Sequence, residues 1–123
     1  MHDLFDLERA VLDALIAQTA DKAPALHQQL SSARVVDREN TGAGFYTRFA
    51  ITAGERMDGV GSPLGDIGAE IEGLKYGMGF LLWLRDGAAE ALEGYTYTGD
   101  STVGLDFAAV RYSAVGPRLG PTT

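Results

Sequence analysis

Apolar side chains in the first third of the chain recur at the spacing of a helix. Residues 19–24 interrupt this pattern, because a helix rarely continues into the residue before a proline. A second, shorter helix is expected from Pro24 to Ser32. The first helix is predicted to begin near Asp3 as its cap and to bury one stripe, with positions three or four apart: Leu4, Leu7, Glu8, Val11, Leu12, Leu15 and Ile16.

From Arg34 onward the period changes to two, which is the period of a strand. Strands are expected at Arg34–Glu39 and Phe45–Thr52. Between them stand Asn, Thr and two glycines, which predict a hairpin loop at residues 40–44. The segment 53–63 contains three glycines and a proline and is interpreted as a long, mobile loop.

Three more strands are expected in the second half of the chain. Residues 66–72 alternate Ile and Ala with acidic residues, which predicts a strand with one solvated face. Tyr76–Arg85 is apolar on both faces, as a central strand is. The last strand is expected from Leu105 to Tyr112.

The dipeptide Asp86-Gly87 favours a two-residue type I′ turn, which fixes the register of the strands on either side. Uninterrupted pairing from this turn places Arg85 opposite Ala88, and it places Phe80 opposite Glu93. It also predicts further pairs along the two strands: Trp83 with Glu90, Leu81 with Leu92, Gly79 with Gly94 and Met78 with Tyr95.

The glycines divide the chain into two compositional halves, since all 16 lie at or after Gly42. Glycine is costly in helices and useful in turns, so this distribution indicates helices first and strands afterwards. The predicted fold class is α+β, with two N-terminal helices packed on one face of a five- or six-stranded, mostly antiparallel sheet. The chain is short enough for one domain, expected at residues 1–115, followed by a flexible tail at 116–123.

Charge and composition remove several function classes. With 17 acidic and 10 basic residues the net charge is −7, which argues against nucleic-acid binding. The chain has no cysteine and only two histidines, His2 and His27, so neither a metal site nor a cofactor is expected. The acidic N-terminus does not resemble a secretory signal, and no apolar stretch is long enough to span a bilayer. A cytoplasmic protein without membrane contact is the expectation.

The predicted register places Glu93 on an apolar face beside Phe80. A carboxylate there costs several kcal/mol unless it is paired, or else its pKa rises. Glu93 is therefore either a general acid or base in a pocket, or one half of an ion pair with Arg38 or Arg48.

If the two hairpins are neighbours, five residues line one cleft at a patch of the sheet left bare by facing glycines. That patch would accept a ligand, a partner backbone or a helix. The predicted ligand-binding residues are Arg38, Glu39, Glu93, Tyr95 and Tyr97.

Two weaker candidates are weighed against structural alternatives. The backbone amides around Gly42 and Gly44 are able to form an anion-binding nest, although glycines usually occur in hairpin loops because they adopt positive φ angles. The acidic row Asp66, Glu70 and Glu72 offers calcium ligands but lacks an EF-hand-like loop, so a solvated strand face is favoured.

Two strings, Arg-Glu-Asn-Thr-Gly-Ala-Gly-Phe-Tyr-Thr at residues 38–47 and Leu-Glu-Gly-Tyr-Thr-Tyr at residues 92–97, resemble recurring signatures of a family of small bacterial proteins. The likeness covers about half of the chain, from Arg34 to Tyr97. That family has no established activity, so the resemblance implies a bacterial, cytoplasmic, single-domain protein and assigns no catalytic residue.

Three functions follow as hypotheses. The leading one is a non-enzymatic interaction module that self-associates through a sheet face, because two short helices cover only one face. The second is an immunity-like or antitoxin-like inhibitor, whose acidic charge steers it onto a basic protein partner. The third is a small-molecule-binding protein or carboxylate-based enzyme that uses Glu93 and Arg38.

Overall fold

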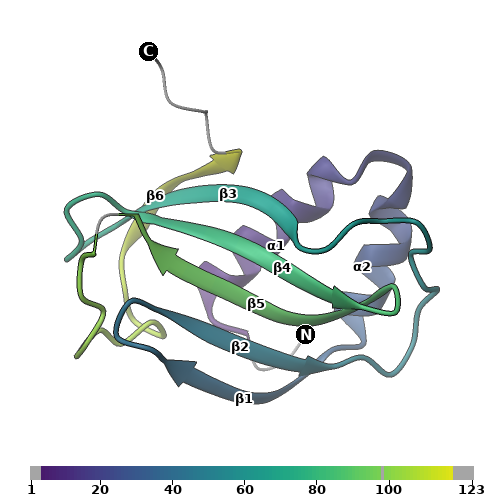
Figure 1. Ribbon diagram of the computed structural model, residues 1–123, viewed down its shortest axis with the longest axis horizontal. Coiled ribbons are helices and arrows are strands. Elements are labelled where there is room, and N and C mark those ends of the chain that lie inside the picture. The colour runs from purple at the N-terminus through teal and green to yellow at the C-terminus, as the bar shows by residue number, and fades with distance from the viewer. Residues whose placement is uncertain (1–3, 98, 118–123) are drawn as a thin grey trace.

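A computed structural model describes residues 4–97 and 99–117. Two N-terminal helices pack on one face of a six-stranded sheet with the strand order β1-β2-β5-β4-β3-β6, and every neighbouring pair is antiparallel. Figure 1 shows both helices behind the sheet. The fold class predicted from the sequence is confirmed. The elements are α1 (Asp6–Gln18), a short 3-10 turn (Ala20–Lys22), α2 (Ala23–Ser31), β1 (Arg34–Asn40), β2 (Gly44–Ala50), β3 (Leu64–Ile71), β4 (Met78–Arg85), β5 (Ala88–Thr96) and β6 (Tyr112–Pro117).

Helix α1 begins at Asp6 with Phe5 as its N-cap, so the predicted start near Asp3 is too early, and Asp3 itself lies outside the described residues. The cause is Glu8, whose carboxylate Oε1 accepts the backbone N–H of Phe5 at 2.8 Å. A side chain at the third helical position that reaches back in this way satisfies one otherwise unpaired donor at the helix start. The predicted stripe is confirmed, since Leu7, Val11 and Leu15 are at most 1% exposed.

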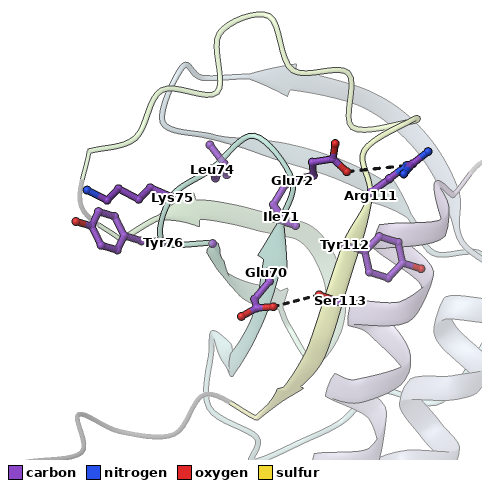
Figure 2. Close-up of a pocket in the computed structure, with 10 residues that line it drawn as sticks. Glu70, Ile71, Glu72, Leu74, Lys75, Tyr76, Arg111, Tyr112 and Ser113 are labelled. Atoms are coloured by element: carbon purple, nitrogen blue, oxygen red, sulfur yellow. Dashed lines mark hydrogen bonds and ion pairs between the residues drawn. The ribbon is translucent and has the colours of Figure 1, made fainter.

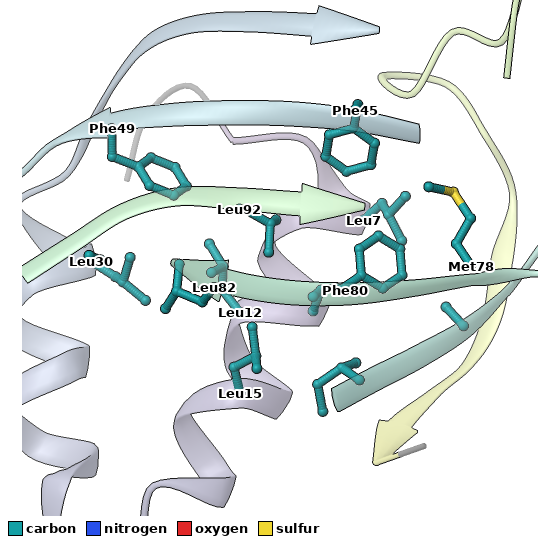
Figure 3. Close-up of a cluster of buried hydrophobic side chains, with 14 of the residues drawn as sticks. Leu7, Leu12, Leu15, Leu30, Phe45, Phe49, Met78, Phe80, Leu82 and Leu92 are labelled. Atoms are coloured by element: carbon teal, nitrogen blue, oxygen red, sulfur yellow. The ribbon is translucent and has the colours of Figure 1, made fainter. Parts of the chain in front are cut away.

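The hydrophobic core lies between the two helices and the facing side of the sheet. Alternate residues of the central strands, such as Phe80 and Leu82 on β4 and Leu92 on β5, point toward the helices. Figure 3 shows these side chains packed against leucines of α1 and α2. Burial of this one continuous layer is the main stabilising contribution to the fold.

The turn at Asp86-Gly87 forms as predicted, with positive φ angles of 50° and 77°. The register predicted for β4 and β5 beyond this turn is wrong by one residue. Leu84 lies opposite Ala89 but Trp83 lies opposite Ala91, so Glu90 is an extra residue in a β-bulge. From there on β5 is shifted, and Glu93 lies opposite Leu81 instead of Phe80.

The last strand is β6 at Tyr112–Pro117 and not the predicted segment from Leu105 to Tyr112. Residues 107–109 form a turn within an irregular segment, because the Asp106 carboxylate accepts the N–H of Ala108 at 3.0 Å and the Asp106 carbonyl accepts that of Ala109. The apolar residues of this segment, Leu105, Phe107 and Val110, pack against the core from a loop. The predicted tail includes two residues of β6, and its remainder, 118–123, lies outside the described residues.

The sheet has a second face that neither helix covers, and it is the one turned to the viewer in Figure 1. We call it the open face and define it by outward-pointing residues of the three central strands β2, β5 and β4. Both central positions of the sheet are taken by β4 and β5, as the apolar character of β4 on both sides predicts. The open face comprises Tyr46, Arg48, Leu81, Trp83, Arg85, Glu90, Ala91, Glu93 and Tyr95, and Tyr97 follows just beyond the end of β5.

Candidate functional site

The predicted cleft does not form, because its charged residues lie on opposite faces of the sheet. Arg38 is paired with Thr47, and both side chains point to the helices, where they meet Glu8. Glu93 is paired with Tyr46 and points to the open face. The one-residue shift at the bulge explains the error, since a slip of one residue moves a side chain to the other face.

Arg38 belongs to a buried ion pair between β1 and α1. Its Nη2 and Nε atoms donate to the Glu8 carboxylate at 2.7 and 3.0 Å, and its guanidinium lies 3.7 Å from the centre of the Phe5 ring. Glu8 is 1% exposed and also accepts hydrogen bonds from the Thr47 hydroxyl and the Phe5 amide. A carboxylate saturated by four donors is typical of a structural pair that holds a helix onto a sheet.

Glu39 borders the same small hollow as Arg38, but its carboxylate and the two tyrosines of the predicted site have other partners. Glu39 accepts a hydrogen bond from Arg48 at 3.0 Å in the solvent-exposed part of β1. The Tyr95 hydroxyl donates to the Asp66 carboxylate at 2.9 Å, and the Tyr97 hydroxyl donates to the Met78 carbonyl at 2.9 Å. The Tyr95 and Tyr97 rings meet edge to face at a centroid distance of 5.7 Å.

The two glycines predicted to face each other are not paired: Gly79 lies opposite Tyr95 and Gly94 opposite Phe80, and they leave no bare patch. A Cβ atom on Gly79 would lie 2.5 Å from the Tyr95 ring, so the ring already occupies that space on the open face. Gly94 faces the core, where a Cβ would lie 2.6 Å from Phe45. Both glycines therefore make room for aromatic side chains of the chain itself.

The nest predicted around Gly42 and Gly44 is filled by the chain itself. The Gly42 amide donates to the Asn40 side chain at 2.9 Å, and the Gly44 amide donates to the buried Thr102 hydroxyl at 3.0 Å. These contacts hold the loop after β5 against the first hairpin. The acidic row Asp66, Glu70 and Glu72, on β3 and just after it, forms no metal cluster either, since no group of three or more His, Asp or Glu in the described part of the chain fits a metal ion.

The bulge creates a hollow on the open face that sequence reasoning did not identify. Ala89 and Leu92 both contribute to the core, so the two residues between them, Glu90 and Ala91, both lie toward the open face. Ala91 pairs with Arg48 on one side and Trp83 on the other. The small Ala91 side chain thus forms the floor of a hollow of about 260 Å³, which is lined by Tyr46, Arg48, Trp83, Glu90 and Ala91.

Glu93 holds the two aromatic walls of this hollow at one end. Trp83 Nε1 donates to the Glu93 carboxylate at 2.9 Å. Partial burial, followed by the charge of Glu93 and a hydrogen bond to it, raises the pKa of Tyr46 above its ordinary value. Both donors are neutral, and Glu93 makes no ion pair within the described residues.

Arg48 forms the third side of the hollow and is firmly held. Its Nη1 atom lies 2.7 Å from Asp37 and its Nη2 atom 3.0 Å from Glu39. Hydrogen bonds to these two carboxylates raise the pKa of Arg48 further. The guanidinium also lies 5.4 Å from the centre of the Tyr46 ring, which is a cation–π distance.

A larger hollow of about 460 Å³ lies at the far end of the sheet, between the ends of β3 and β6 and the loop before β4 (Figure 2). Its polar groups are weakly held: Ser113 donates to Glu70 at 3.2 Å, and Arg111 is 3.9 Å from Glu72. Arg111 and Glu72 are mostly exposed, and such pairs contribute little binding energy. The smaller hollow over Ala91 has the more closely fixed walls.

Two further findings concern membrane-spanning helices and similarity to known proteins. Among the described residues, no helix is long and apolar enough to cross a membrane. Searches of family models, curated proteins and solved structures find no match to this chain. The resemblance to a family of small bacterial proteins stays a prediction.

Proposed function

We propose that the protein is a cytoplasmic, non-enzymatic interaction module that binds a second copy of itself through the open face. The observation that carries this proposal is Trp83, which lies on β4, one of the two central strands, and is 37% exposed. Tryptophan is strongly enriched at the centres of protein interfaces and is uncommon on exposed surfaces.

The helix-free side of the whole sheet is close in size to a dimer interface. Six strands about 4.8 Å apart, each about seven residues long at about 3.3 Å per residue, span roughly 650 Å². A standard interface buries about 800 Å² per partner, so a dimer centred on the open face would also use the helix-free side of the flanking strands β1, β3 and β6. In an isologous contact, each copy would bury the open face of the other, which neither helix covers.

The charges of the open face and its border support a self-complementary contact. Arg48 and Arg85 lie among the carboxylates of Asp37, Glu39 and Glu90, so both signs are present on one surface. A surface that carries both signs is able to pair with itself when the partner is rotated by a twofold axis.

The proposal predicts that Trp83→Lys abolishes self-association without unfolding the chain. A lysine in place of the indole brings a charge into the centre of the interface, while the Glu93 carboxylate beside it gains a partner in the monomer. Sedimentation equilibrium of the wild type is expected to give a dimer at micromolar concentrations, and the variant a monomer.

Val103→Lys is the matched control, because Val103 is 77% exposed and lies in the loop after β5 instead of on the open face. It should dimerise as the wild type does. A wild type that is monomeric throughout, or a Trp83→Lys variant that dimerises normally, contradicts the proposal.

The immunity-like or antitoxin-like alternative rests on the acidic charge alone, and no contact in the structure favours it. The carboxylate-based enzyme was expected to use Arg38 and Glu93 together, but these two side chains lie on opposite faces of the sheet. Neither is developed further.

A further inference from the structure

We infer that the hollow over Ala91 receives the Arg85 side chain of a second copy of the chain. This inference rests on the proposed function and adds the contact that would define the geometry of the dimer. It concerns a site built from Tyr46, Trp83 and Glu90, with Glu93 beside it.

The size of the hollow limits its occupant to a single side chain or a group of similar size. Pockets for small molecules generally have volumes of about 300–1,000 Å³. The hollow over Ala91 has about 260 Å³ and is open to solvent on one side. A guanidinium group on a flexible stem fits these dimensions.

The chemistry of the hollow favours a cation. Its walls include the Trp83 indole, the best cation–π partner among the side chains. The charged groups in and around it are the four carboxylates of Asp37, Glu39, Glu90 and Glu93 and the two guanidinium groups of Arg48 and Arg85. The local balance is therefore −2, and Glu93 has only neutral donors in the described part of its own chain.

Arg85 is the cation on this face that is able to move. Arg48 is held by two carboxylates at 2.7 and 3.0 Å. Arg85 is 76% exposed, and its one ion pair within the described residues is a contact of 3.4 Å to Glu90, which is about half exposed. An exposed pair of this kind contributes at most about 1 kcal/mol, so exchanging it for the same contact in a second copy costs little.

The positions of donor and hollow suit a twofold arrangement. Arg85 is two residues from Trp83 on β4, so both side chains point to the same face of the sheet. In an isologous dimer, if Arg85 of one copy enters the hollow of the other, the reverse contact forms as well. Each dimer then contains two equal contacts, in which the guanidinium lies over the indole with Glu90 at the rim.

The test uses two variants that each remove a different half of the contact. Arg85→Ala keeps an intact hollow but lacks the side chain that fills it. Trp83→Ala keeps Arg85 but lacks the aromatic wall. Each variant alone should dimerise at least about ten-fold more weakly than the wild type, since both contacts of the dimer are impaired.

A one-to-one mixture of the two variants should form a heterodimer more readily than either variant forms a homodimer. Only the mixed pair contains one intact contact, in which Arg85 of one copy meets Trp83 of the other. Native mass spectrometry separates the three dimers by mass. Arg111→Ala is the matched control, because it removes an exposed arginine with an equally weak pair at the far end of the sheet, and it should dimerise like the wild type.

The outcomes separate this inference from the proposed function. A monomeric wild type overturns both. A dimeric wild type with an equally dimeric Arg85→Ala variant, or a mixture with no excess of heterodimer, overturns the Arg85 contact alone and leaves self-association through the open face standing.

Discussion

At the scale of single residues, the most consequential group inside the fold is the Glu8 carboxylate. The helical stripe in the sequence places Glu8 among the inward-facing positions, whereas the predicted partner of Arg38 is Glu93. The sequence alone could not join Glu8 to Arg38, because they are 30 residues apart and the strand register decides which acid faces the arginine. In the structure, Arg38 forms its ion pair with Glu8, and Glu93 lies on the open face.

Replacement of Glu8 is expected to destabilise the fold strongly. Glu8→Gln removes the charge on which two hydrogen bonds from Arg38 and two from Thr47 and Phe5 depend, in a site that is 1% exposed. Breaking a buried pair costs about 3–5 kcal/mol, and the partial exposure of Arg38 places the expected loss near the lower end of that range.

The same substitution at Glu72 is the control for that measurement. Glu72→Gln affects a carboxylate that is 3.9 Å from an exposed arginine, so its loss should stay below about 1 kcal/mol. Urea unfolding measures both free energies. Equal losses for the two variants would mean that the Glu8 pair does not hold α1 onto the sheet.

At the scale of elements, helices and strands could be predicted where periodicity is strong, and the turn at Asp86-Gly87 could be predicted from its residues. The bulge at Glu90 could not, because an extra residue in a strand leaves no mark in composition. Strand β6 was missed for a related reason: Phe107 gives the preceding loop the apolar pattern of a strand, whereas β6 itself contains glycine and proline. Both errors concern sites where tertiary packing overrides local pattern.

Deletion of Glu90 tests the bulge directly. Without this residue, the pairs Leu84–Ala89 and Trp83–Ala91 would form one regular ladder, and every later residue of β5 would keep its present face. The shortened chain should fold with a loss of about 1 kcal/mol or less, as for an ordinary surface change. Circular dichroism shows whether the shortened chain folds, and thermal unfolding measures its loss of stability.

Deletion of Glu93 from the regular part of the same strand should unfold the chain. It would move Tyr95 into the inward place of Gly94, where even a Cβ lies 2.6 Å from Phe45. If the deletion of Glu90 proves as damaging as the deletion of Glu93, the extra residue is not where the structure places it.

At the scale of the whole molecule, the sequence was sufficient for the fold class and for the expectation that one sheet face lacks helices. It did not show where on that face the aromatic side chains gather, since this depends on the strand order and on the bulge. The net charge of −7 adds a constraint, because two copies repel each other at long range.

Salt decides how strongly that repulsion opposes a dimer. Two centres of charge −7 about 25 Å apart repel by about 3.5 kcal/mol when the Debye length is about 30 Å, and by less than about 0.5 kcal/mol when it is about 8 Å. The exposed contacts that salt weakens contribute at most about 1 kcal/mol each. Self-association should therefore strengthen between about 0.01 M and 0.15 M salt, whereas binding to a basic protein would weaken.

The most direct test of self-association through the open face is acrylamide quenching of Trp83 fluorescence in a dilution series at these two salt concentrations. Trp83 is the one tryptophan of the chain, so the signal reports on the open face alone. We predict that quenching decreases as protein concentration rises, and that the decrease occurs at lower protein concentration in the higher salt. The protein concentration is raised to about 100 times the micromolar Kd expected for the dimer. Quenching that does not depend on protein concentration at either salt over this range would contradict the account.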